Sequence, residues 1–185
     1  MTTDARHGPN WRLIGWGAAA ALLALPALAM RVTAEMNWDA FDFLVWGAML
    51  LAAGGVIELG ARVRGGASRP AYQGGVAVAT FAAFLLVWVD LAVGVIGDEG
   101  HPANLLFAGV LALVVGGAVL ARGRAPGLAR TMLAAAAAQA LIALAATAMR
   151  WGAGSPTWPA DLLGGAAVFT TLWLLAAFLF ARAAR

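Results

Sequence analysis

The sequence contains no cysteine and no lysine, and it has only two histidines among its 185 residues. Without cysteine, the chain can form neither disulfides nor thiolate metal sites, and thiol-based catalysis is excluded. The absence of lysine excludes Schiff-base chemistry and with it a retinal protein. The histidines, His7 and His101, fall in a polar N-terminal segment and in a predicted loop, which excludes a haem held between two buried histidines.

Charged residues are also scarce. They make up 11% of the chain, whereas 63% of the residues are hydrophobic. Soluble domains have about 45–50% apolar and about 25% charged residues, so this composition indicates an integral membrane protein. The net charge is +3, but the arginines that carry it are scattered at predicted helix ends, so nucleic acid is not an expected partner.

Six apolar stretches are long enough to cross a hydrocarbon core about 30 Å thick, which takes about 20 helical residues. The predicted spans are residues 11–30, 41–61, 72–97, 105–121, 131–149 and 161–181. Lipid offers no hydrogen bonds to the backbone, so each span must be a helix. We therefore expect an all-α membrane protein, a bundle of six transmembrane helices in a single domain that covers residues 1–185.

The arginines predict the orientation. Ten of them lie at the two ends of the chain and after the second and fourth spans, and only Arg31 and Arg150 lie on the opposite side. By the positive-inside rule, both termini face the cytoplasm. The first span has an alternative interpretation as a secretory signal cleaved after the small residues 27–29. A similar run of residues, 140–150, recurs where no such cleavage is expected.

The three predicted hairpins resemble one another. Each ends in Ala-Arg, at residues 61–62, 121–122 and 181–182, and Trp38 and Trp158 precede the second and sixth spans at matching places. This spacing favours three helical hairpins in a parallel repeat. The alternative is that Ala/Leu-rich helices of equal length are alike by composition alone.

Acidic residues gather at the predicted outer side, and they suggest a cation site. Carboxylate oxygens are the ligands that calcium and magnesium prefer. The alternative is that these residues cap the helix N-termini, where the helix dipole favours negative charge. The candidate ligands are Glu35, Asp39, Asp42, Asp98, Glu99 and His101.

Few polar groups lie within the predicted spans. Asp90 is placed about 10 Å inside the outer end of the third span, and Gln139 lies in the fifth. A carboxylate inside a membrane is costly, so Asp90 and Gln139 form a candidate intramembrane site, with Asp90 as a proton relay or substrate group. The alternative for Asp90 is a structural hydrogen bond. Glu58 precedes Arg62 by one helical turn, which favours an ion pair.

The segment from Trp88 to Asn104 is the least generic part of the chain. We expect a tight turn there, with Asn104 as the N-cap of the fourth helix. The segment resembles one in a family of small, uncharacterised integral membrane proteins of proteobacteria, and the similarity extends from Glu35 to residues 122–124. The resemblance implies a bacterial inner membrane and no particular activity. Asn is common in that family at the position of Asp90, which weakens a proton-relay role.

These observations favour a non-enzymatic protein without cofactors, because no Ser/His/Asp constellation or metalloprotease motif is present. We predict a subunit, scaffold or accessory factor of a membrane complex, whose partners are the lipid bilayer and another membrane protein or a second copy. One alternative is a small cation or proton transporter or channel. A further alternative is an outward-facing cation or pH sensor that uses the outer acidic residues.

Overall fold

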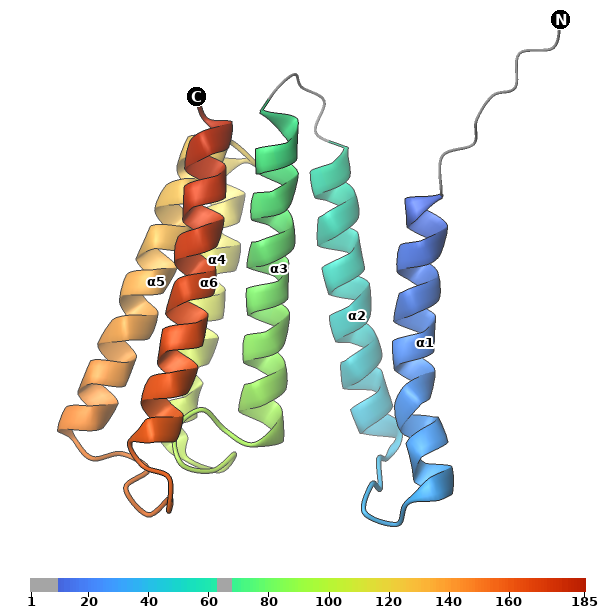
Figure 1. Ribbon diagram of the computed structural model, residues 1–185, viewed down its shortest axis with the longest axis vertical. Coiled ribbons are helices and arrows are strands. Elements are labelled where there is room, and N and C mark those ends of the chain that lie inside the picture. Colours follow the sequence, from blue (N-terminus) through green and yellow to red (C-terminus); the bar gives the residue numbers. More distant parts are fainter. Residues whose placement is uncertain (1–9, 63–67) are drawn as a thin grey trace, which may run out of the picture. The chain divides into compact units, whose positions relative to one another are not determined.

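The computed structural model describes residues 10–62 and 68–185, so His7 lies outside the described residues. In this part of the chain six long α-helices occur, and there is no strand (Figure 1). All six are long and apolar enough to cross a membrane, which confirms the predicted all-α class. The helices are α1 (Trp11–Val32), α2 (Ala40–Ala61), α3 (Arg69–Ala92), α4 (Leu105–Ala121), α5 (Ala125–Ala148) and α6 (Ala160–Ala183), with a short 3-10 helix, η1 (Pro102–Asn104), before α4.

The observed helix ends match the predicted spans at α4 and differ most at α3. This helix begins at Arg69 rather than residue 72 and ends at Ala92 rather than residue 97. Gly94 and Gly97 have φ angles of 73° and 71°, a left-handed conformation that a helix cannot continue through. Asp90 therefore lies in the last turn of α3, about 3 Å from the helix end rather than the expected distance of about 10 Å.

The other large difference is the start of α5. It begins at Ala125 rather than residue 131, because the helix extends beyond its apolar part through Arg130. Pro126 lies in the first turn of α5. Backbone N–H groups of a first turn form no intrahelical hydrogen bond, so a proline without an N–H is tolerated there.

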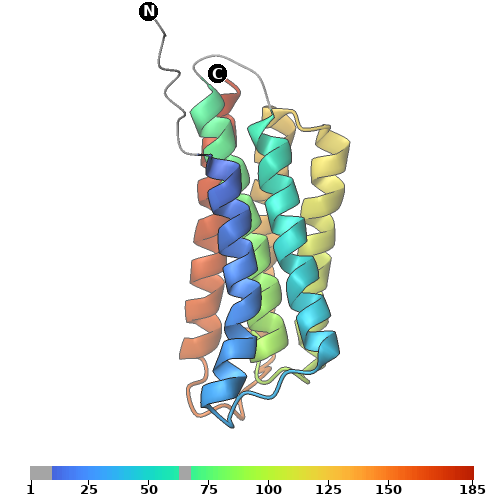
Figure 2. The same ribbon diagram turned by 90° about the vertical axis from the view of Figure 1, so that its right-hand side faces the viewer.

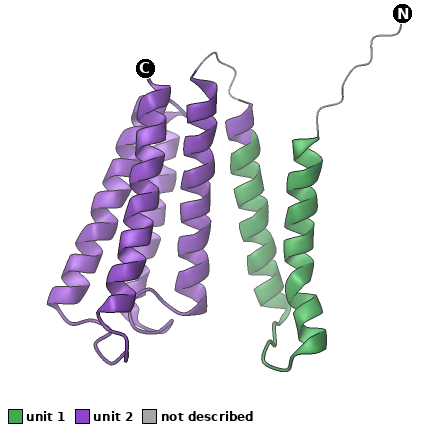
Figure 3. Ribbon diagram, in the orientation of Figure 1, with its two compact units in different colours: residues 1–58 green, residues 59–185 purple. Residues whose placement is uncertain are grey.

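Contacts divide the chain into two compact units (Figure 3). Unit 1 is Met1–Glu58 and unit 2 is Leu59–Arg185, so the boundary falls near the end of α2. The described part of unit 1 is a hairpin of α1 and most of α2. Pro26 is the only buried residue of this described part, which shows that the hairpin has almost no core of its own.

A polar contact compensates for Pro26 inside α1. Proline has no N–H, so the carbonyl of Leu22, one turn earlier, lacks its usual intrahelical donor. The indole N–H of Trp46 on α2 donates to this carbonyl at 3.0 Å. In lipid no water could do so, and the contact therefore both satisfies α1 and attaches α2 to it.

Unit 2 has a true core. Its helices alternate in direction, with α6 packed against α3 and α5, and α4 packed against α5 (Figures 1 and 2). Trp173, Phe107 and Phe180 are among its largest fully buried side chains. Close packing depends on small residues: a methyl group at Gly75 would lie 2.9 Å from the Phe180 ring.

Candidate functional site

The loop between α3 and α4 is organised by the side chain of Asn104. Its Oδ1 accepts a hydrogen bond from the Ile96 N–H at 2.9 Å, and its Nδ2 donates to the Asp98 carbonyl at 2.7 Å. Asn104 is buried and occupies the N-cap position of α4, as predicted, but its side chain forms no cap hydrogen bond there. The amide instead satisfies loop backbone groups that belong to no helix.

Two glycines join this loop to the loop between α5 and α6. Gly97 and Gly152 both have positive φ, and a methyl group on Gly152 would lie 2.7 Å from the Gly97 nitrogen. The two backbones are therefore in direct contact. At this end of unit 2 the segment that includes Trp88–Asn104 forms a tightly constrained structure.

Two acidic residues of unit 1, Asp39 and Asp42, cap a helix. Asp39 Oδ1 accepts hydrogen bonds from the backbone N–H groups of Phe41 and Asp42, at 2.7 Å and 3.0 Å. Asp42 Oδ2 accepts from the Asp39 N–H at 2.9 Å. This reciprocal pair satisfies free N–H groups at the start of α2, which is the capping alternative.

The remaining candidate ligands do not gather around a common point within their units. His101 Nδ1 accepts from the Ala103 N–H at 3.2 Å and so caps η1. Glu35, Asp98 and Glu99 are exposed. Among the described residues of each unit, no three His, Asp or Glu side chains are arranged to hold a metal ion.

Three polar side chains in the interior of unit 2, two of them fully buried, have enclosed atoms without a hydrogen-bond partner among the described residues. Gln139 and Trp173 are 0% exposed, and neither the Gln139 amide atoms nor Trp173 Nε1 has a partner among the described residues. Thr80 Oγ1 is likewise unpaired. By contrast, the hydroxyls of Thr131 and Thr147 bond to carbonyls one turn earlier, at 3.1 Å and 2.8 Å.

These three side chains lie well inside their helices. At 1.5 Å per residue, Gln139 is about 13 Å from the end of α5 at Ala148, and Trp173 is about 20 Å from the start of α6. Thr80 is about 18 Å from the end of α3. They are neutral hydrogen-bonding groups, so none of them carries a charge for general acid–base chemistry.

Asp90 is at a different depth from Gln139, its predicted companion. It lies about 3 Å from the end of α3, and its Oδ1 is enclosed without a hydrogen-bond partner among the described residues. Its side chain is only partly buried. The two predicted intramembrane residues therefore do not share one level of the bundle.

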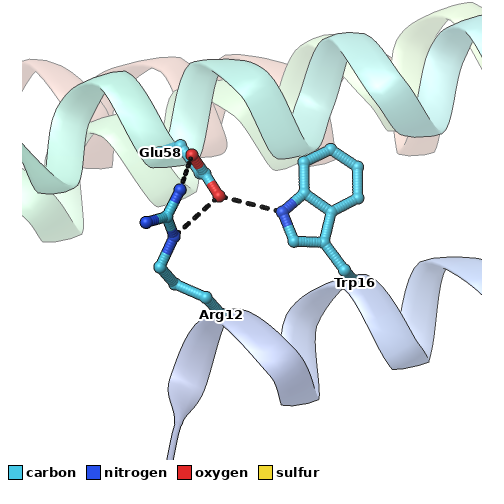
Figure 4. Close-up of polar contacts among 3 residues, drawn as sticks. All are labelled: Arg12, Trp16 and Glu58. Atoms are coloured by element: carbon cyan, nitrogen blue, oxygen red, sulfur yellow. Dashed lines mark hydrogen bonds and ion pairs between the residues drawn. The ribbon is translucent and has the colours of Figure 1, made fainter.

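Unit 1 contains an ion pair that joins its two helices (Figure 4). Arg12 contacts Glu58 through two nitrogens, Nε to Oε1 at 3.0 Å and Nη2 to Oε2 at 2.6 Å. The Trp16 indole N–H donates to Glu58 Oε1 at 2.9 Å. Gly54 lies one turn before Glu58 and has no side chain, which lets the Trp16 ring lie against α2. No local sequence pattern indicates this contact, because Arg12 and Glu58 are 46 residues apart.

No known protein family, curated protein or solved structure matches this chain. The fold defines the class: an all-α protein with six described helices able to cross a membrane. The resemblance to the proteobacterial family stays a prediction.

Proposed function

We propose that the protein is a non-enzymatic subunit, scaffold or accessory factor of a bacterial inner-membrane complex, with both termini in the cytoplasm. The hairpin of unit 1 carries this proposal. Polar contacts join its two helices at two levels, Arg12–Glu58 and Trp46–Leu22, yet Pro26 is the only buried residue in its described part. The hairpin is thus held in a defined shape by its own contacts, while its apolar surface is not covered within unit 1.

Open glycines on the hairpin support a protein partner. Within unit 1, a methyl group at Gly15, Gly17 or Gly55 would meet no neighbouring atom within 4 Å. A helix that faces only lipid gains nothing from glycine, which lowers helix propensity by about 1 kcal/mol relative to alanine. Small residues do allow the helix of another protein to approach closely.

Photocrosslinking in native membranes tests this proposal. A photoreactive amino acid at Gly17 or Gly55 should give a discrete adduct with one other membrane protein. Leu141, an exposed apolar residue of α5, is the control position and should give lipid adducts only. Lipid adducts alone at all three positions would contradict a partner at the hairpin.

The proposed orientation can be tested separately because the chain has no cysteine. Gly154→Cys, between α5 and α6, should react with an impermeant maleimide after only the outer membrane is permeabilised. Ala184→Cys, beyond α6, should react only after the inner membrane is also opened. The reverse pattern would show that the termini lie outside.

A second candidate function is a small cation or proton transporter, in which the unpaired amide of Gln139 in the core of unit 2 would coordinate a cation and the Asp90 carboxylate would carry a proton. Flux measured in proteoliposomes should then fall with Gln139→Leu and with Asp90→Asn. Gln73→Leu is the matched control, since Gln73 is only partly buried on α3. If the wild-type protein carries no cation or proton flux, this candidate is rejected.

A further inference from the structure

An open depression with a volume of about 530 Å³ lies at the turn between α4 and α5. It lies at the end of unit 2 where α3 begins and α6 ends (Figure 1). Three arginines line it together with apolar residues: Arg122, Arg124, Arg130, Val119, Leu120 and Pro126. The depression therefore has a cationic part and an apolar part.

The cationic part is not neutralised within the described chain. No carboxylate lines the depression, and none of its three arginines forms an ion pair with a described residue. The N-terminus of α5 opens beside them, and its N-cap residue, Arg124, provides no side-chain acceptor. The positive end of the helix dipole therefore adds to the three guanidinium charges.

The turn that presents these arginines is held in place. The hydroxyl of Tyr72 on α3 donates to the Gly123 carbonyl at 2.9 Å, and the Arg124 N–H donates to the Ala121 carbonyl at 2.9 Å. A methyl group on Gly127 would lie 2.6 Å from Ala121 Cβ, so the end of α4 and the start of α5 are in close contact. The backbone positions of the arginines are thus fixed before any ligand binds.

The apolar part is unusually open. Val119 and Leu120 are 70% and 85% exposed, and they directly precede the arginine-bearing turn at the end of a predicted span. A free anion would use only the arginines. An amphiphile with an anionic head and a hydrocarbon chain would use both parts of the surface.

We propose that this depression binds an anionic phospholipid, with the headgroup phosphate among Arg122, Arg124 and Arg130 and an acyl chain along Val119 and Leu120. One guanidinium group can donate two parallel hydrogen bonds to two oxygens of a phosphate, so arginine suits this role better than lysine. Basic pockets on the cytoplasmic side of membrane proteins bind anionic headgroups in this way. The proposal does not depend on the proposed role as a subunit, but its cytoplasmic placement rests on the proposed orientation.

Native mass spectrometry of the full-length protein with added phosphatidylglycerol tests the proposal. Arg124→Gln/Arg130→Gln should weaken lipid binding about 30-fold, equivalent to about 2 kcal/mol for two arginines. Arg182→Gln/Arg185→Gln is the matched control, because it removes the same charge at the same end of unit 2. It should bind the lipid within about twofold of wild type.

Folding of the variants is checked by melting in zwitterionic lipid, where all should match wild type. If the double variant melts lower, Arg130→Gln alone is used; its exposed side chain has no described partner, and it should weaken binding about fivefold. An equal loss in the Arg182/Arg185 control would overturn the site in favour of diffuse charge attraction.

Competition with inorganic phosphate distinguishes a lipid headgroup from free phosphate as the anion that binds in the depression. We expect phosphate at the same concentration to compete weakly and to leave the thermal stability unchanged, while phosphatidylglycerol raises it. If phosphate alone reproduces the full stabilisation by the lipid, the depression is a free-anion site and the lipid assignment is wrong.

Discussion

Replacing Trp46 with phenylalanine should weaken the α1–α2 hairpin, because it removes the donor to the Leu22 carbonyl. The bond has a normal length of 3.0 Å, and Pro26 leaves that carbonyl without its usual helical donor. Leu22 lies near the middle of α1, where lipid offers no replacement. Hydrogen bonds between membrane helices average about 0.6 kcal/mol, and a stranded polar group costs about 1–3 kcal/mol, so we expect a loss of about 1–2 kcal/mol.

A double-mutant cycle separates this bond from the smaller size of phenylalanine. Pro26→Ala restores an N–H that can bond to the Leu22 carbonyl, so Trp46→Phe should then lose only its packing contribution. The coupling free energy between the two positions should be about 1 kcal/mol.

Steric trapping can measure these free energies in bicelles. Labelled cysteines at Leu13 and Ile57, both exposed and near the same end of the hairpin, would report separation of α1 from α2. If Trp46→Phe lowers the free energy of unfolding equally in the wild-type chain and in the Pro26→Ala variant, the Trp46–Leu22 bond does not compensate for the missing proline donor.

Three further predictions concern unit 2, and each can be checked by equilibrium unfolding. Asn104→Ala strands the buried Ile96 N–H and should destabilise unit 2 by about 2–4 kcal/mol, whereas exposed Asn37→Ala should change stability by less than about 0.5 kcal/mol. Gly152→Ala forces a side chain into a left-handed conformation against Gly97 and should cost about 2–4 kcal/mol, whereas Gly154→Ala, in open space, should be neutral. Gln139→Leu removes an unpaired buried amide and should stabilise unit 2 by about 1–2 kcal/mol, unlike Gln73→Leu.

Each of these predictions has a result that contradicts it. If Asn104→Ala destabilises the protein no more than Asn37→Ala does, the loop between α3 and α4 does not depend on the Asn104 amide. If Gly152→Ala and Gly154→Ala change the free energy of unfolding equally, the close backbone contact between Gly152 and Gly97 is contradicted. A loss of stability in Gln139→Leu would show that the amide has a partner in the membrane.

Hydropathy alone predicts the six helices, because crossing a bilayer demands long apolar stretches. The ends of α4 are predicted correctly at Leu105 and Ala121. At α3 the same reasoning fails, since apolar residues continue to Ile96 while the backbone has already left the helix. The spacing of Gly94 and Gly97 was the available signal for this earlier end.

The polar contacts were harder to predict because they join residues far apart in sequence. Glu58 makes a bidentate contact with Arg12 on the other helix of the hairpin, which its spacing from Arg62 does not indicate. Matching the depths of Arg12 and Glu58 in an antiparallel hairpin would have suggested this pair. Pro26 similarly indicates that the Leu22 carbonyl lacks its intrahelical donor. Nothing in the sequence of α1, however, identifies Trp46 as the replacement donor.

The proposed role as a subunit can be tested most directly by the mass of the native particle. Membrane patches extracted with an amphipathic copolymer, without detergent, would be purified through a tag on this chain and measured by native mass spectrometry. We expect the 18.9 kDa chain together with a different membrane protein in constant stoichiometry. Particles that contain only this chain, alone or as multiples of its mass, would contradict it.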